Sequence, residues 1–184
     1  MKNQELNNIL ESIKNAKRIY RDQAAMAIME KPSLFPCLLH KVFDIDDPLH
    51  IKAAWTFELV CLEELKTLDP YIHQFILGIP LLKHESALRP VSKICSLWME
   101  RYLSEDHINV SLSKDEIDEI VSCNFDWLIE EHKVATQVFA MDTLSLFAPE
   151  EIWIRQELKS ILEHKAESGS SGYKAHARKL LKNL

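Results

Sequence analysis

Glu58 is the residue of this sequence whose type and position most suggest chemistry. A helix over residues 48–65 gathers an apolar stripe on one side, and at about 100° per residue Glu58 falls near the centre of that stripe. The stripe consists of Ile51, Ala54, Trp55, Cys61, Leu62 and Leu65. An unpaired carboxylate in an apolar seam is costly, so it either takes up a proton or finds a partner.

Two interpretations of Glu58 follow. It is either a buried polar link to a neighbouring helix or an acid that contacts a ligand or a substrate. We expect the link, with Glu58 mostly buried and bonded to a residue such as Arg21, Arg89 or the indole N–H of Trp98.

Five cationic residues form a second candidate, a partner-binding surface. They lie beside the apolar stripes of the predicted long helices, in a chain whose formal net charge is -6. These residues are Lys52, Arg89, Lys93, Lys174 and Arg178. On the concave face of a helical array they could bind an acidic peptide, a phosphate-bearing ligand or nucleic acid. The alternative is that they are ordinary solvated helix positions.

The other polar residues form no pattern typical of a catalytic or metal site. Cys37 and His40 lie three residues apart and Glu131 adjoins His132, but no second pair with ligand spacing accompanies either. The sequence contains neither an HExxH motif nor a serine in a nucleophile turn. We therefore predict no catalytic residue, no metal and no cofactor. Trp55, Trp98, Trp127 and Trp153 occur among apolar residues and are expected to pack between helix layers.

The composition is typical of a helical globular protein. Hydrophobic residues make up 47% and charged residues 27% of the 184 positions, and 3 glycines leave little scope for β-turns or a phosphate-binding loop. No signal-peptide pattern and no run of about 20 apolar residues occurs, so we expect a cytoplasmic protein without a membrane partner. The cysteines (Cys37, Cys61, Cys95 and Cys123) are interpreted as reduced core residues, the alternative being a disulfide or metal role.

Helical periodicity extends along the chain, and no alternating run of β-branched residues predicts a strand. Pro48, Pro70 and Pro149 are expected at the first positions of their helices. Ser113 and Glu116 predict a capping box, and residues 103–112 a connector. The predicted helices cover 3–16, 20–30, 33–43, 48–65, 70–77, 86–102, 114–122 (continued or restarted over 124–131), 132–147, 149–165 and 173–184.

The long helices can be aligned on one another without gaps, which predicts an internal repeat. One column of this alignment holds Ile51, Leu88, Val134 and Tyr173, and the column of Glu58 holds Met29, Cys95, Met141 and Leu180. The irregular period of about 40 residues and the alternation of shorter and longer helices are typical of HEAT or armadillo units. We predict an all-α fold with one domain over residues 1–184, an α-α superhelix of about five HEAT-like helix pairs.

The repeats also resemble a known family. Residues 21–25 (RDQAA) and 51–55 (IKAAW) resemble the second-helix signature of HEAT repeats, a basic residue followed by a pair of small residues. Over nearly its whole length the chain resembles a family of small, wholly helical HEAT-like proteins with no established activity. The resemblance implies a fold whose second helices line a concave face. Later units depart from the signature, with Pro90-Val91, Thr136-Gln137 and Ala175-His176 in place of the small pair.

A further resemblance concerns the loop at residues 169–174. Gly169-Ser170-Ser171 with Lys174 resembles part of the GSS-x-MP-x-K-x-NP loop of the fumarase and adenylosuccinate lyase superfamily. The Met-Pro and Asn-Pro elements are absent, and 184 residues are too few for that three-domain enzyme. We therefore expect a loop that joins two helices.

The function expected from these features is that of a non-catalytic cytoplasmic interaction or scaffold module, which binds a protein or peptide on its concave face. The alternative is a nucleic-acid-binding or DNA-repair protein of the HEAT-like alkylation-repair glycosylase type. Such proteins need a basic concave face with aromatic and acidic residues near the DNA, which the cationic positions, Trp55 and Glu58 resemble. The net charge of -6 disfavours this alternative.

Overall fold

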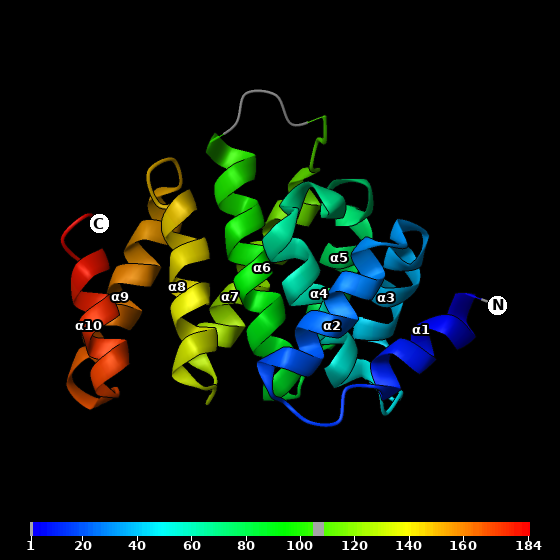
Figure 1. Cartoon of the computed structure of the whole chain (residues 1–184). Helices are drawn as coiled ribbons and strands as arrows, with labels where there is room; N and C mark the ends of the chain where they lie inside the picture. The colour runs from blue at the N-terminus through cyan, green and yellow to red at the C-terminus, as the bar shows by residue number, and fades with distance from the viewer. Residues whose placement is uncertain (1, 105–108) are drawn as a thin grey trace. The chain divides into compact units, whose positions relative to one another are not determined.

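The computed structural model describes residues 2–104 and 109–184, whose regular secondary structure is entirely helical (Figure 1). Because these residues contain no strand, the predicted all-α class is confirmed. The α-helices are α1 (Lys2–Glu11), α2 (Arg18–Met29), α3 (Phe35–Phe43), α4 (His50–Glu63), α5 (Ile72–Gly78), α6 (Glu85–Ser104), α7 (Lys114–Ile129), α8 (Val134–Phe147), α9 (Ile152–Ser168) and α10 (Ser171–Leu180). Short 3₁₀ helices are η1 (Pro32–Leu34), η2 (Leu65–Tyr71) and η3 (Ile79–Leu81).

The chain divides into two compact units, Met1–Ile94 and Cys95–Leu184, and the division falls within α6. Each unit has its own buried apolar residues. The single repeat domain over residues 1–184 therefore stays a prediction.

In the first unit α4 is the central helix, against which both α2 and α3 pack. The small pairs at residues 24–25 of α2 and 53–54 of α4 are at most 2% exposed, and small side chains allow two helices to approach closely. Phe57 of α4 contacts two aromatic rings, those of Phe35 and Phe75, at centroid distances of 6.0 and 5.8 Å. The core of this unit thus contains small residues where α4 meets α2 and aromatic residues around Phe57.

In the second unit α8 packs against α7, α9 and α10, and α9 also packs against α10 (Figure 1). Ala140, Met141 and Leu144 of α8 are fully buried, as is Ala177 of α10. A helix with neighbours on several sides needs apolar residues around most of its circumference. This requirement explains why the sequence of α8 contains no Lys, Arg or Glu.

The start of α7 shows the predicted capping box. The Ser113 hydroxyl accepts a hydrogen bond from the Glu116 N–H at 3.3 Å, and the Glu116 carboxylate accepts one from the Ser113 N–H at 2.8 Å. The helix then runs without interruption to Ile129, so the stretch over residues 124–131 continues the first helix. Of the predicted connector over residues 103–112, residues 105–108 lie outside the described residues.

The predicted positions of three prolines are wrong. Pro48 lies in the turn before α4, Pro70 within η2, and Pro149 in the turn before α9, so none opens its α-helix. Before α4 the reason is local, because the Asp47 carboxylate accepts a hydrogen bond from the Leu49 N–H at 2.8 Å. This side-chain bond stabilises a turn and delays the helix to His50.

Helix length and apolarity bear on the membrane prediction. Among the described residues, no helix combines the length and the apolar character that crossing a bilayer requires.

Candidate functional site

Glu58 lies in the middle of α4 and is 3% exposed. Arg89 of α6 donates from Nη1 to Oε1 at 3.2 Å and from Nη2 to Oε2 at 2.7 Å. Lys93, one turn later on α6, places its Nζ 3.5 Å from Oε1. Such a charge-assisted, bidentate pair offsets the cost of removing the carboxylate from water. These three residues, the Glu58 cluster, therefore link α4 to α6.

The geometry of the Glu58 cluster also bears on the catalytic interpretation. Both carboxylate oxygens accept hydrogen bonds from a cation, and the Glu58 side chain is 5% exposed. A general acid or base must exchange its proton with a substrate within hydrogen-bond reach. The arrangement of Glu58 is that of a structural ion pair.

Trp55 reinforces the same junction one turn before Glu58. Its indole N–H donates to the Ser86 carbonyl at 2.9 Å. The guanidinium of Arg21, from α2, lies over the indole ring at 5.8 Å from the ring centroid. Arg21, one of the partners expected for Glu58, thus lies on Trp55, which contacts both α2 and α6 from its place on α4.

The cations of the first unit are less available to a partner than their sequence positions suggest. The side chains of Arg89 and Lys93 are 35% and 28% exposed, and they share the single carboxylate of Glu58. Part of their positive charge is therefore neutralised within the chain. Lys52, on α4, is half-buried.

Lys174 and Arg178 lie on α10, in the second unit. Lys174 is half-buried and Arg178 is exposed. Between them in sequence, the His176 Nε2 atom lies 2.6 Å from an Asp142 carboxylate oxygen, which links α10 to α8. The five predicted partner-binding cations are thus divided between the two units.

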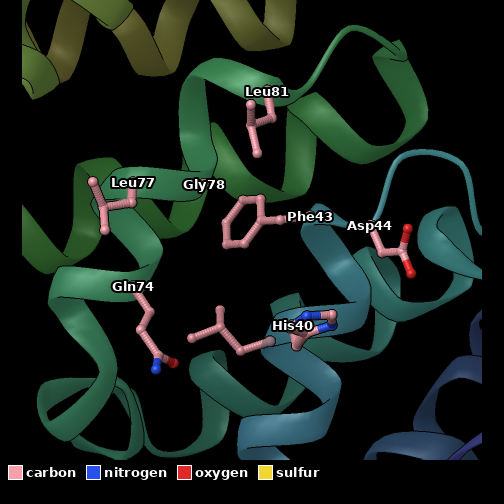
Figure 2. A pocket seen from close by; sticks show the side chains of 8 residues that line it. His40, Phe43, Asp44, Gln74, Leu77, Gly78 and Leu81 are labelled. Atoms are coloured by element: carbon pink, nitrogen blue, oxygen red, sulfur yellow. The ribbon is translucent and has the colours of Figure 1, made fainter.

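A hollow between α3 and α5 is a candidate site that the sequence patterns do not predict. Its volume is about 550 Å³, and Figure 2 shows side chains from both sides facing the same space. It is lined by Leu39, His40, Phe43, Asp44, Gln74, Leu77, Gly78 and Leu81. Leu77 is 74% exposed and Leu81 is 49% exposed. Large apolar side chains are thus left uncovered beside polar ones.

Gly78 determines how closely the two sides of this hollow approach. A Cβ atom at this position would lie 2.3 Å from two carbon atoms of the Phe43 ring. Only glycine therefore allows the ring to rest on the last residue of α5. The Phe43 ring also contacts Phe75 edge-on, with centroids 5.9 Å apart.

A second hollow, of about 400 Å³, continues the first along α3. The two share His40, Asp44 and Gln74. The remaining lining residues of the second hollow are Asn3, Pro36, Cys37 and Lys41. From Pro36 to Asp44, at 1.5 Å per residue, the combined surface is about 12 Å long. We call the two hollows together the α3–α5 groove.

The polar side chains shared by both hollows have no partner within the described residues. His40, Asp44 and Gln74 make no side-chain hydrogen bond or ion pair there. Asp44 is half-buried and lines both hollows of the α3–α5 groove, and no cation among the described residues forms an ion pair with it.

Asp47, close to Asp44 in sequence, differs from Asp44 because it has a cationic partner. Burial raises the pKa of Asp47, but hydrogen bonds from Lys41 and from the Leu49 N–H lower it by more than burial raises it. The pKa therefore lies below its usual value. The Lys41 Nζ atom lies 2.5 Å from the Asp47 carboxylate. Lys41, although it lines the groove, is thus already paired.

Two of the cysteines, Cys61 and Cys95, have the properties of structural thiols. Burial raises the pKa of Cys61 well above its ordinary value, and it raises the pKa of Cys95 to about 12. A thiol of such high pKa is not ionised at neutral pH and is a poor nucleophile.

Among the residues that the structure describes, no group of three or more His, Cys, Asp or Glu side chains could hold a metal ion.

The α3–α5 groove therefore combines uncovered apolar side chains with an unneutralised carboxylate, whereas the charges of the Glu58 cluster are used within the fold. Comparison with protein families, with curated proteins and with solved structures found no match.

Proposed function

We propose that this chain is a non-catalytic interaction module that binds a segment of a partner protein in the α3–α5 groove. The observation that carries the proposal is the 74% exposure of Leu77 at the edge of a hollow of about 550 Å³. Exposed apolar surface rimmed by polar side chains is typical of protein-interaction sites. The unpartnered side chains of His40, Asp44 and Gln74 supply the polar groups that would fix the orientation of the bound segment.

We further propose that the helices are HEAT-like pairs of an α-α superhelix. In the first unit α3 packs on α4, and α2 packs on α4. In the second unit α7 packs on α8, α9 on α10, and α8 on α10. Contacts within a pair and between the second helices of successive pairs are expected for this architecture, and they support the proposal.

The cationic positions are proposed as a second surface, on the concave face of such an array. Lys52, Lys174 and Arg178 are its better candidates, because Arg89 and Lys93 already share a carboxylate. The cysteines support a reducing compartment such as the cytoplasm, since all four are free thiols.

Partner recovery by variants tests which surface is used. The tagged chain is cross-linked in a cell lysate, and bound proteins are identified by mass spectrometry for the wild type, Leu77→Glu and Ile19→Glu. Ile19, on α2, is 61% exposed and is absent from the groove lining, so it controls for the loss of an exposed apolar side chain. The proposal expects the same partner with the wild type and Ile19→Glu, and its loss with Leu77→Glu.

Charge reversal tests the second surface separately. Lys52→Glu and the pair Lys174→Glu with Arg178→Glu leave Arg89 on the buried Glu58 carboxylate. If these variants lose the partner while Leu77→Glu retains it, the cationic surface replaces the groove as the binding site. Failure of the wild type to retain any specific partner would contradict the interaction function.

A further inference from the structure

We infer that the occupant of the α3–α5 groove is a short amphipathic helix of a partner protein, with apolar side chains three or four residues apart and a Lys or Arg beside them. This inference rests on the function proposed above and specifies the chemistry of the partner. It follows from the apolar surface, the charge and the dimensions of the groove.

The apolar surface consists of side chains from both sides. Leu77 and Leu81 stand four residues apart on the α5–η3 side, and the half-buried Phe43 ring stands opposite them (Figure 2). Covering these side chains requires apolar groups of the partner, because polar groups placed there would lose hydrogen bonds to water. An amphipathic helix offers apolar residues at positions i, i+3 and i+4 on one face.

The charge comes from Asp44. Asp44 lines both hollows, and its carboxylate has no ion-pair partner within the described residues. The one cation in the lining, Lys41, is paired with Asp47. An acidic partner would place like charges together, whereas a Lys or Arg would form an ion pair partly shielded from water.

The length of the groove and the absence of a strand among the described residues favour a helix over an extended peptide. A groove of about 12 Å matches about eight helical residues, or two turns. An extended peptide commonly binds by adding a strand to a sheet edge, and the part of the chain described by the structure contains no strand.

Selection from a phage-displayed library of random dodecapeptides tests the inference without a known partner. We expect enriched peptides to share two apolar residues three or four apart and at least one Lys or Arg. Leu77→Glu should weaken their binding by about tenfold or more, as truncation of a central interface residue does. Ile19→Glu should bind them like the wild type, and circular dichroism should show that both variants remain folded.

The charge is tested by a reciprocal change. Asp44→Lys should weaken basic peptides by about tenfold, and the same peptides with Glu in place of Lys or Arg should bind Asp44→Lys better than the wild type. Equal binding of basic and acidic peptides to the wild type would overturn the inference.

The outcomes also separate this inference from the proposed function. Neutral or acidic peptides that bind the wild type and are lost with Leu77→Glu would overturn the basic occupant and support an interaction groove. Peptides insensitive to Leu77→Glu, or no enriched peptide, would contradict both. Sedimentation analysis excludes a second copy as the occupant if the wild type and Leu77→Glu are both monomers. A dimer that Leu77→Glu dissociates would overturn the inference.

Discussion

Arg89 binds both carboxylate oxygens of Glu58, a residue 31 positions earlier in the chain and on another helix, at 3.2 and 2.7 Å. The pair is asymmetric, because the Glu58 side chain is 5% exposed whereas that of Arg89 is 35% exposed. Removal of Arg89 therefore has a different consequence from removal of Glu58. Without Arg89 a buried carboxylate remains, whereas without Glu58 the guanidinium can still reach water.

We predict that Arg89→Met lowers the free energy of unfolding by about 2 kcal/mol, since Lys93 compensates only part of the charge left on Glu58. The double variant Glu58→Met with Arg89→Met should lose less than the sum of the single variants, because it leaves no buried charge. Urea unfolding measures both, with Lys52→Met as the control cation on α4. Additive effects of the two single changes would show that the pair is not coupled.

Lys165 of α9 stabilises the end of α7. Its Nζ atom donates to the carbonyls of Leu128 and Ile129 at 2.7 and 3.0 Å, and burial lowers its pKa from the ordinary value. The last carbonyls of a helix lack intrahelical partners, so this lysine replaces missing hydrogen bonds. We predict that Lys165→Met lowers the free energy of unfolding by about 1 kcal/mol.

The measurement for Lys165 is thermal unfolding followed by circular dichroism. Lys159, an exposed residue of the same helix, supplies the control variant Lys159→Met. Hydrogen exchange adds a local test, because the amides at the end of α7 should lose protection only in Lys165→Met. Equal melting temperatures for the two variants would contradict the capping role.

Features encoded by residues close in sequence could be predicted. Features that depend on contacts between residues distant in sequence could not. The capping box at Ser113 is encoded within four residues, and it is present. The burial of Glu58 follows from its place in an apolar stripe. The pairing of Arg89 depends on the distance between α4 and α6, so the sequence could not decide whether Arg89 was a partner of Glu58 or a free cation.

The α3–α5 groove could not be predicted for a similar reason. Its walls meet through Phe43 and Gly78, which lie far apart in the sequence. In sequence, Gly78 predicts the end of a helix, and it is indeed the last residue of α5. Its second role, contact with an aromatic ring, leaves no periodic signal. Likewise, the exposure of Leu77 depends on which neighbours fail to cover it.

The Phe43–Gly78 contact gives a third prediction. Gly78→Ala places a methyl group 2.3 Å from the ring, so the ring must move or α5 must shift away from α3. We expect the free energy of unfolding to fall by about 2 kcal/mol, as in other overpacked sites. Gly172→Ala is the matched control, because its Cβ meets Val134 at 3.4 Å, an ordinary contact. A Gly78→Ala protein as stable as Gly172→Ala would show that the ring is not confined.

His50 gives the last prediction, a dependence of stability on pH. His50 is the first residue of α4 and is 9% exposed, and its Nδ1 atom is buried without a hydrogen-bond partner. Burial, and secondly His84, whose ring centroid lies 6.4 Å from that of His50, lower the pKa of His50, although Asp47, a hydrogen bond with the Val42 backbone and Asp44 oppose this change. An added proton on Nδ1 would therefore be buried without an acceptor.

The sign of the effect follows from the lowered pKa. The unfolded chain has the ordinary value of 6.5, so on acidification the unfolded state takes up the proton before the folded state. The contribution of His50 to stability is thus fully present above pH 6.5 and is lost as the pH falls through the folded pKa. Urea unfolding at about pH 7.5 and about pH 5.5 should show a smaller loss on acidification for His50→Gln than for the wild type. His164→Gln, which changes an exposed histidine of α9, should retain the wild-type loss, and an equal loss in all three proteins would refute the assignment to His50.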